Sequence, residues 1–121
     1  AASFTQIAGV AALEGDQQPV VDMVAEFKKR RSVVVDGLNS IDGVTCRTPD
    51  GAFYAFPNIR GTNMTSQEFA DACMYEAGVA LLPGTSFGKY GEGYARLSFA
   101  NSEENLLKGI AQIKDMLAAR K

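Results

Sequence analysis

The chain has 121 residues, of which 46% are hydrophobic and 21% are charged, and its formal net charge is −2. This length and composition predict one folded domain rather than a disordered chain. The slightly acidic balance argues against a nucleic-acid or anionic-membrane partner, and no apolar run in the sequence is long enough to span a bilayer.

An apolar helix is predicted first, over residues 3–14 (SFTQIAGVAALE), which contain a single charged residue, Glu14. Such a helix has almost no face suited to solvent and needs cover on most sides. Two explanations stay open for an element at this end of a small domain. Either it is disordered, or the surface that covers it lies outside this chain.

A second, longer helix is predicted to begin at residues 16–19 (DQQP), which offer an acidic capping residue and a proline in the first turn. Its apolar positions recur every three or four residues as far as Ile41, and Gly43 is expected to end it. The basic run at residues 28–31 spreads around the circumference of this helix. We interpret it as solvated surface charge.

Two short strands are predicted next, at residues 44–48 and 52–56, with turn residues at 49–51 (PDG) between them. The second segment, AFYAF, is apolar on both faces. This pattern favours a strand inside a layered structure rather than one at its edge.

Two more helices follow from capping signals. Thr65 to Glu68 fits a capping box, and Gly78 is expected to close the helix that it starts. Ser102 precedes a last helix whose apolar residues, Leu106 and Ile110 among them, share one face. Together the elements predict an α+β fold in which helices pack against a small mixed or antiparallel sheet.

Between these two helices, residues 79–82 and 94–100 predict strands on either side of a glycine-rich loop. Alternation in the second strand places Arg96 on the face opposite Leu97 and Phe99. An arginine fixed on a strand can hold a carboxylate through two parallel hydrogen bonds. The alternative is a structural salt bridge or an edge-strand charge.

Other chemistry in this stretch is not expected. The loop lacks the glycine and lysine spacing of a nucleotide-binding motif, and no helix follows it to hold a phosphate. Ser86 and Lys89 have the spacing of a serine–lysine pair, but the surrounding glycines disfavour the helical turn that would bring them together.

The residue inventory excludes further mechanisms. The chain has no histidine, so histidine-based catalysis and histidine-ligated zinc cannot occur within it. Cys46 and Cys73 are far apart in sequence, and no metal is expected. We expect two buried or half-buried thiols in a reducing compartment, and therefore a cytoplasmic protein.

Three segments, PDGAFYAFP (49–57), VALLPGTSFG (79–88) and YARLSFA (94–100), are the most specific part of a resemblance that covers the whole chain. The sequence resembles class I aminotransferases, the aspartate aminotransferase family of fold type I pyridoxal-phosphate enzymes. The resemblance implies a long N-terminal helical segment. It also implies that residues 1–18 pack on a large domain and that residues 19–121 form the small C-terminal domain.

The resemblance implies roles for four residues. Arg96 matches the arginine that binds the substrate's α-carboxylate in this family. Phe53, Tyr54 and Phe87 match positions that line the active-site cleft, although core packing is an equal alternative for Phe53 and Tyr54.

The sequence departs from the family in its lysines. None lies in the Ser-rich, Gly-x-Arg context of the cofactor-binding lysine, so no catalytic or cofactor-binding residue is expected within this chain. The resemblance implies a parent enzyme that uses pyridoxal 5'-phosphate, an amino acid (aspartate-like favoured) and a 2-oxo acid, and that forms a homodimer. The isolated chain is expected to be inactive. A stand-alone, non-catalytic α+β module binding a small carboxylic acid or a protein remains the alternative.

Overall fold

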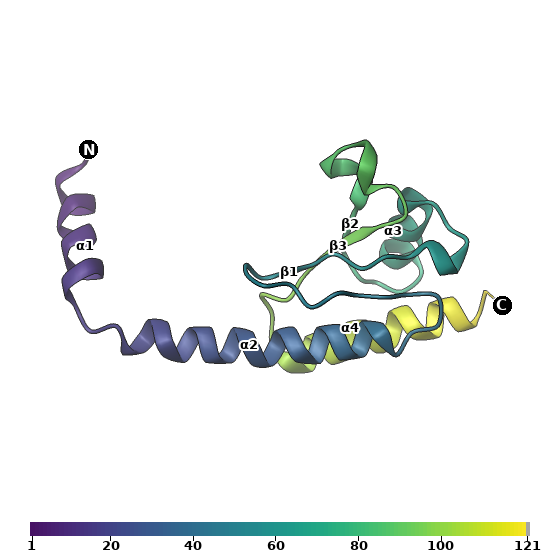
Figure 1. Cartoon of the computed structure of the whole chain (residues 1–121), viewed down its shortest axis with the longest axis horizontal. Coiled ribbons are helices and arrows are strands. Elements are labelled where there is room, and N and C mark those ends of the chain that lie inside the picture. Colours follow the sequence, from purple (N-terminus) through teal and green to yellow (C-terminus); the bar gives the residue numbers. More distant parts are fainter. Residues whose placement is uncertain (121) are drawn as a thin grey trace.

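The computed structural model describes residues 1–120 and has an α+β architecture, as predicted (Figure 1). Four α-helices and three short strands form it within this range. In chain order they are α1 (Ser3–Glu14), α2 (Gln18–Asn39), β1 (Tyr54–Ala55), α3 (Ser66–Tyr75), β2 (Leu82–Pro83), β3 (Ala95–Ser98) and α4 (Glu103–Ala118). Three 3₁₀ turns complete the chain at Arg60–Thr62 (η1), Gly84–Phe87 (η2) and Lys89–Gly91 (η3).

The sheet is antiparallel, with β3 in the centre and β1 and β2 on either side. Tyr54 of β1 lies opposite Ser98, and Leu82 of β2 lies opposite Arg96. The interpretation of residues 52–56 as an interior strand is wrong, because β1 is an edge strand of this sheet. Within β1, the Tyr54 ring contacts Arg96 and Ala55 is buried in the core.

The strand predicted at residues 44–48 is also absent, apart from a single bridge between Thr45 and Asn58. The Asn39 side chain explains the difference. Its amide nitrogen donates to the Cys46 carbonyl at 3.0 Å, and its oxygen accepts from the Cys46 N–H at 2.7 Å. Because a side chain satisfies both backbone groups of Cys46, this segment has no need of a strand partner there.

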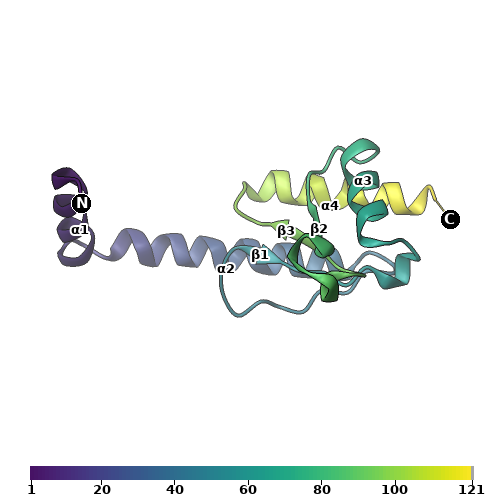
Figure 2. The same ribbon diagram turned by 90° about the horizontal axis from the view of Figure 1, so that it is seen from above.

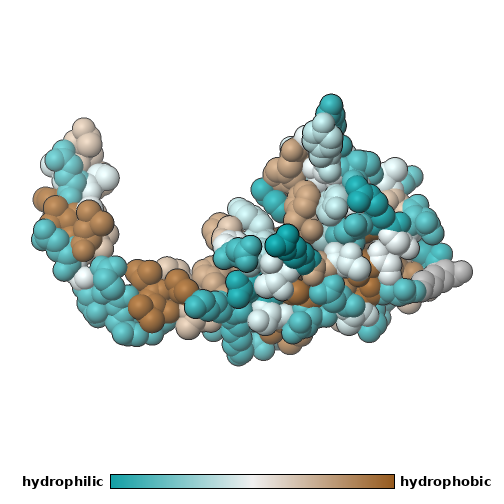
Figure 3. Space-filling view, in the orientation of Figure 1, coloured by the Kyte–Doolittle hydropathy of each residue, from teal (hydrophilic) through white to brown (hydrophobic). Residues whose placement is uncertain are grey.

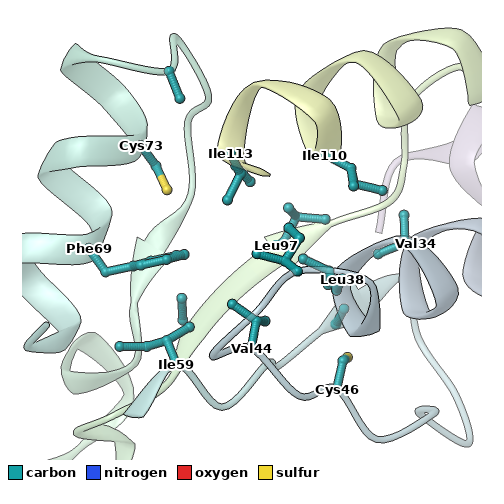
Figure 4. Close-up of a cluster of buried hydrophobic side chains, with 14 of the residues drawn as sticks. Val34, Leu38, Val44, Cys46, Ile59, Phe69, Cys73, Leu97, Ile110 and Ile113 are labelled. Atoms are coloured by element: carbon teal, nitrogen blue, oxygen red, sulfur yellow. The ribbon is translucent and has the colours of Figure 1, made fainter. Parts of the chain in front are cut away.

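The hydrophobic core lies between the sheet and the helices α2, α3 and α4. Helices α2 and α4 run side by side along one face of the sheet in both ribbon views (Figures 1 and 2). The alternation predicted for β3 is confirmed, since Ala95, Leu97 and Phe99 are all buried. Figure 4 shows side chains from every layer meeting there, including Val34, Leu38, Ile59, Phe69, Leu97, Ile110 and Ile113.

The predicted helix caps are confirmed in α3 and α4. Thr65 accepts a hydrogen bond from the Glu68 N–H at 3.2 Å, and the Glu68 carboxylate accepts from the Thr65 N–H at 2.9 Å. Ser102 caps α4 by accepting from the Asn105 N–H at 3.2 Å. These caps fix where each helix begins and therefore how its apolar face meets the sheet.

Helix α1 covers the predicted residues but stands away from the rest of the chain (Figure 1). All of its side chains are exposed, and Phe4 and Leu13 keep 76% and 86% of their surface. Val20 and Val24, in the first turns of α2, are also exposed. Figure 3 shows a second hydrophobic patch there, separated from that of α1 by hydrophilic residues. Among residues 1–120, no helix has both the length and the hydropathy to cross a membrane.

Candidate functional site

Arg96 lies on the central strand β3, and its side chain leaves the sheet on the face opposite the core. Two aromatic rings contact it. The guanidinium carbon is 4.4 Å from the ring centre of Tyr54 and 4.2 Å from that of Phe87. The structure therefore brings together Tyr54 of β1, Phe87 of η2 and Arg96 of β3. These are three of the four predicted site residues.

No hydrogen bond or ion pair within residues 1–120 involves the Arg96 side chain. The salt-bridge alternative therefore finds no partner in this part of the chain, and the edge-strand alternative is wrong because β3 is central. A guanidinium carries five N–H donors. Those of Arg96 are available to an external acceptor such as a carboxylate.

The glycine-rich loop positions Phe87 at the end of η2. Gly84 and Gly91 meet backbone to backbone, so that a Cβ on either would overlap the carbonyl oxygen of the other. The Gly84 N–H also donates to the Tyr94 carbonyl at 2.8 Å. Ser86 and Lys89 fall in separate 3₁₀ turns with exposed side chains, which gives no support to a serine–lysine pair.

Phe53 points elsewhere. Its ring centre lies 6.0 Å from that of Phe27 on α2 and 4.5 Å from that of Tyr54. It lines a shallow apolar pocket with Phe27 and Phe99, and 40% of its surface is exposed. Phe53 thus packs against Phe27 and Tyr54, and its ring is not among those that contact Arg96.

Sequence reasoning missed Phe56, Tyr94 and Arg60, which extend the aromatic surface. The ring centres of Phe56 and Tyr94 are stacked 5.5 Å apart, and Phe56 contacts the Phe87 ring edge-on at 6.1 Å. The Arg60 guanidinium lies 4.8 Å from the Tyr94 ring centre. Period-2 alternation carried a usable signal, because it places Phe56 on the same face as Tyr54.

Comparison with known proteins bears on the family and the fold. A family model, "Aminotransferase class I and II", matches residues 1–113. An aspartate aminotransferase of Pyrococcus horikoshii is 43% identical over 99% of this chain, and one of Musicola paradisiaca is 42% identical over 97%. The crystal structure of an aromatic aminotransferase from Pyrococcus horikoshii superposes with a TM-score of 0.93 and 39% identity over 98% of this chain.

The fold is that of an aminotransferase domain, with Arg96 held between aromatic contacts on the face of the sheet opposite the core. The chain belongs to the class I and II aminotransferase family. It spans 31% and 30% of the lengths of the two aspartate aminotransferases, and 32% of the crystallised aromatic enzyme. The family implies dependence on pyridoxal phosphate.

The lysines of this chain do not fit the role of cofactor anchor. Such a lysine needs a neutral amine, which burial or a neighbouring cation provides. Every lysine among residues 1–120 is exposed. Lys29 also lies 2.6 Å from the Glu103 carboxylate, whose hydrogen bond raises the pKa of Lys29 and holds the amine in its charged form. Lys121 lies outside the described residues.

Proposed function

We propose that this chain is the C-terminal part of a pyridoxal-phosphate-dependent aminotransferase that moves an amino group between an aspartate-like amino acid and a 2-oxo acid. Family membership and the aspartate aminotransferases among its relatives support the reaction. The cofactor supplies the chemistry of amino transfer when bound. The groups that hold it are proposed to lie outside this chain, because none of the described lysines fits.

The role of this chain is to bind and orient the substrate. Arg96 carries the proposal, because its guanidinium makes no hydrogen bond or ion pair within residues 1–120. Two parallel N–H···O bonds would fix an α-carboxylate in both position and direction. Phe87 and Tyr54 would line the same side of the cleft, and Phe53 would support Tyr54.

The partner surface is proposed to be a large domain that covers residues 1–18, with residues 19–121 forming the small domain. The exposed apolar side chains of α1, Phe4 and Leu13 among them, support this division. We further propose a homodimer of the parent enzyme and a cytoplasmic location. The two free, buried cysteines, Cys46 and Cys73, favour a reducing compartment.

The proposal is tested by Arg96→Lys in the full-length enzyme. Lysine keeps the charge but loses one of two charge-assisted hydrogen bonds, so the KM for aspartate should rise by about 30-fold, or about 2 kcal/mol. Arg47→Lys is the matched control, because Arg47 is an exposed arginine distant in sequence from β3. An Arg96→Lys enzyme with the parent KM would rule out the anchor role.

The isolated chain is expected to be inactive. Purified chain mixed with pyridoxal phosphate, aspartate and 2-oxoglutarate should transfer no amino group, since no described lysine is shielded from solvent. Turnover that disappears when one particular lysine is replaced would contradict this expectation.

A second candidate is a stand-alone, non-catalytic module that binds a small carboxylic acid or a protein. No described lysine fits the role of cofactor anchor, and this favours the module. Arg96 alone could bind an acid without a cofactor. The reading frame upstream of Ala1 separates the two. A preceding domain with a Ser-rich lysine motif supports the enzyme, and a nearby start codon supports the module.

A further inference from the structure

Two aromatic rings lie close to the guanidinium of Arg96. The rings of Tyr54 and Phe87 come from segments far apart in sequence, β1 and η2, yet each lies close to the same guanidinium carbon, at 4.4 and 4.2 Å. Tyr54 and Phe87 make no ring contact with each other within residues 1–120. Each ring is therefore a separate contact to the guanidinium rather than part of one stacked pair.

This arrangement restricts what the arginine can bind. A guanidinium is planar, and all of its N–H donors lie in its plane. Aromatic rings attract the cation through their faces but accept none of these hydrogen bonds strongly. A ring that packs on a guanidinium face leaves the in-plane N–H donors available to an acceptor such as a carboxylate.

The rings are themselves supported. The Phe53 ring centre lies 4.5 Å from that of Tyr54, and the Phe56 ring packs edge-on against Phe87 at 6.1 Å. Phe56 is in turn stacked on Tyr94. These contacts hold both rings in place even though 48% of Phe87 is exposed. The two rings that contact Arg96 are therefore themselves held by contacts within the protein.

We propose that Tyr54 and Phe87 are positioning residues that hold the Arg96 guanidinium in one plane and so set the plane in which the substrate's α-carboxylate is bound. The inference rests on the proposed function of Arg96 as the carboxylate anchor. An arginine that is already ordered loses less conformational entropy on binding, and the benefit appears as substrate affinity.

The test compares ring-removing and ring-keeping variants in the full-length enzyme. Phe87→Leu and Tyr54→Leu remove one ring each, and both should raise the KM for aspartate by about tenfold, the value of one partly desolvated cation–π contact. The kcat should stay within about twofold, because reacting groups are untouched. Phe87→Tyr and Tyr54→Phe keep the rings and should retain the parent KM.

Calorimetry with succinate supplies a readout independent of turnover. Succinate carries carboxylates but no amino group, and its Kd should rise in parallel with the KM in the Leu variants. Unfolding temperatures show whether a variant is folded, and Phe87→Met repeats the test if Leu disturbs the loop. If the rings have a purely structural role, the unfolding temperature should fall, and the KM and Kd should not differ between the ring-keeping and the ring-removing variants.

The outcomes separate this inference from the proposed function. If Arg96→Lys keeps the parent KM, the anchor role fails, and the positioning role fails with it. If Arg96→Lys weakens aspartate while both Leu variants keep the parent KM and Kd, the positioning role alone is overturned. If the ring-keeping variants raise the KM for aspartate as much as the Leu variants do, the positioning role is overturned as well.

Discussion

Replacing Gly91 with alanine tests how tightly the loop that carries Phe87 is built. A Cβ on Gly91 would lie well inside 3.0 Å of the Gly84 carbonyl oxygen, closer than real Cβ atoms come. The opposing atoms belong to the backbone, so no side-chain rotation relieves the overlap. The turns η2 and η3 must therefore separate, and the separation displaces everything attached to them.

The loss of unfolding free energy can be worked out from the contacts that this separation disturbs. Overpacking alone costs about 1 to 3 kcal/mol. The Ser66 hydroxyl donates to the Gly91 carbonyl at 3.2 Å, and the Gly84 N–H donates to the Tyr94 carbonyl at 2.8 Å. Weakening these bonds adds about 1 kcal/mol, since each contributes about that much net. We expect a loss of about 3 kcal/mol, which lowers the Tm of a chain of this size by about 12 °C.

Thermal unfolding of the chain, followed by circular dichroism, measures the effect. Gly51→Ala is the matched control, because nothing lies within 4 Å of a Cβ built there. The control should melt within about 2 °C of the parent. If Gly91→Ala also melts within about 2 °C of the parent, the two turns are not in backbone contact and the reasoning is wrong.

Two further predictions concern titratable groups. Hydrogen bonds from Thr65 hold the pKa of Glu68 below its usual 4.5, and Arg120 likewise lowers the pKa of Glu76. Both carboxylates bind protons less tightly when folded, so their stabilisation is present at neutral pH and is lost as pH falls through the lowered pKa values. The Tm of Glu76→Gln should therefore fall less than the parent's between about pH 7 and about pH 3, and an equal fall would refute the linkage. Burial raises the pKa of Cys73 to about 12, so mass spectrometry should find this thiol unalkylated by iodoacetamide until the chain unfolds; labelling of the folded chain would contradict it.

The helices were predictable because their signals are local. Residues 3–14 match α1, and the Thr65 and Ser102 caps mark where α3 and α4 begin. The strands were less predictable, since pairing depends on distant partners. The Asn39 side chain, several residues earlier in the chain, takes the backbone groups of Cys46 and removes a predicted strand.

The candidate site was predictable in part. Alternation within β3 places Arg96 opposite the core without any reference to other segments. The resemblance supplied Tyr54 and Phe87, but no local pattern shows that both rings meet the guanidinium. Phe56 was missed although alternation places it on the face of Tyr54, because its contact with Phe87 joins segments far apart in the sequence.

Helix α2 can act as a lever. Its 22 residues span about 33 Å, and its buried residues, Val34, Val35 and Leu38, all lie in the half that packs against the core. Because these residues share one core with the sheet, a tilt of this helix would also displace the sheet. A tilt of about 5° about the exposed end displaces the far end by about 3 Å, from the helix length alone. Arg96 would then move together with the Tyr54 and Phe87 rings that contact it, by a distance comparable to a hydrogen bond.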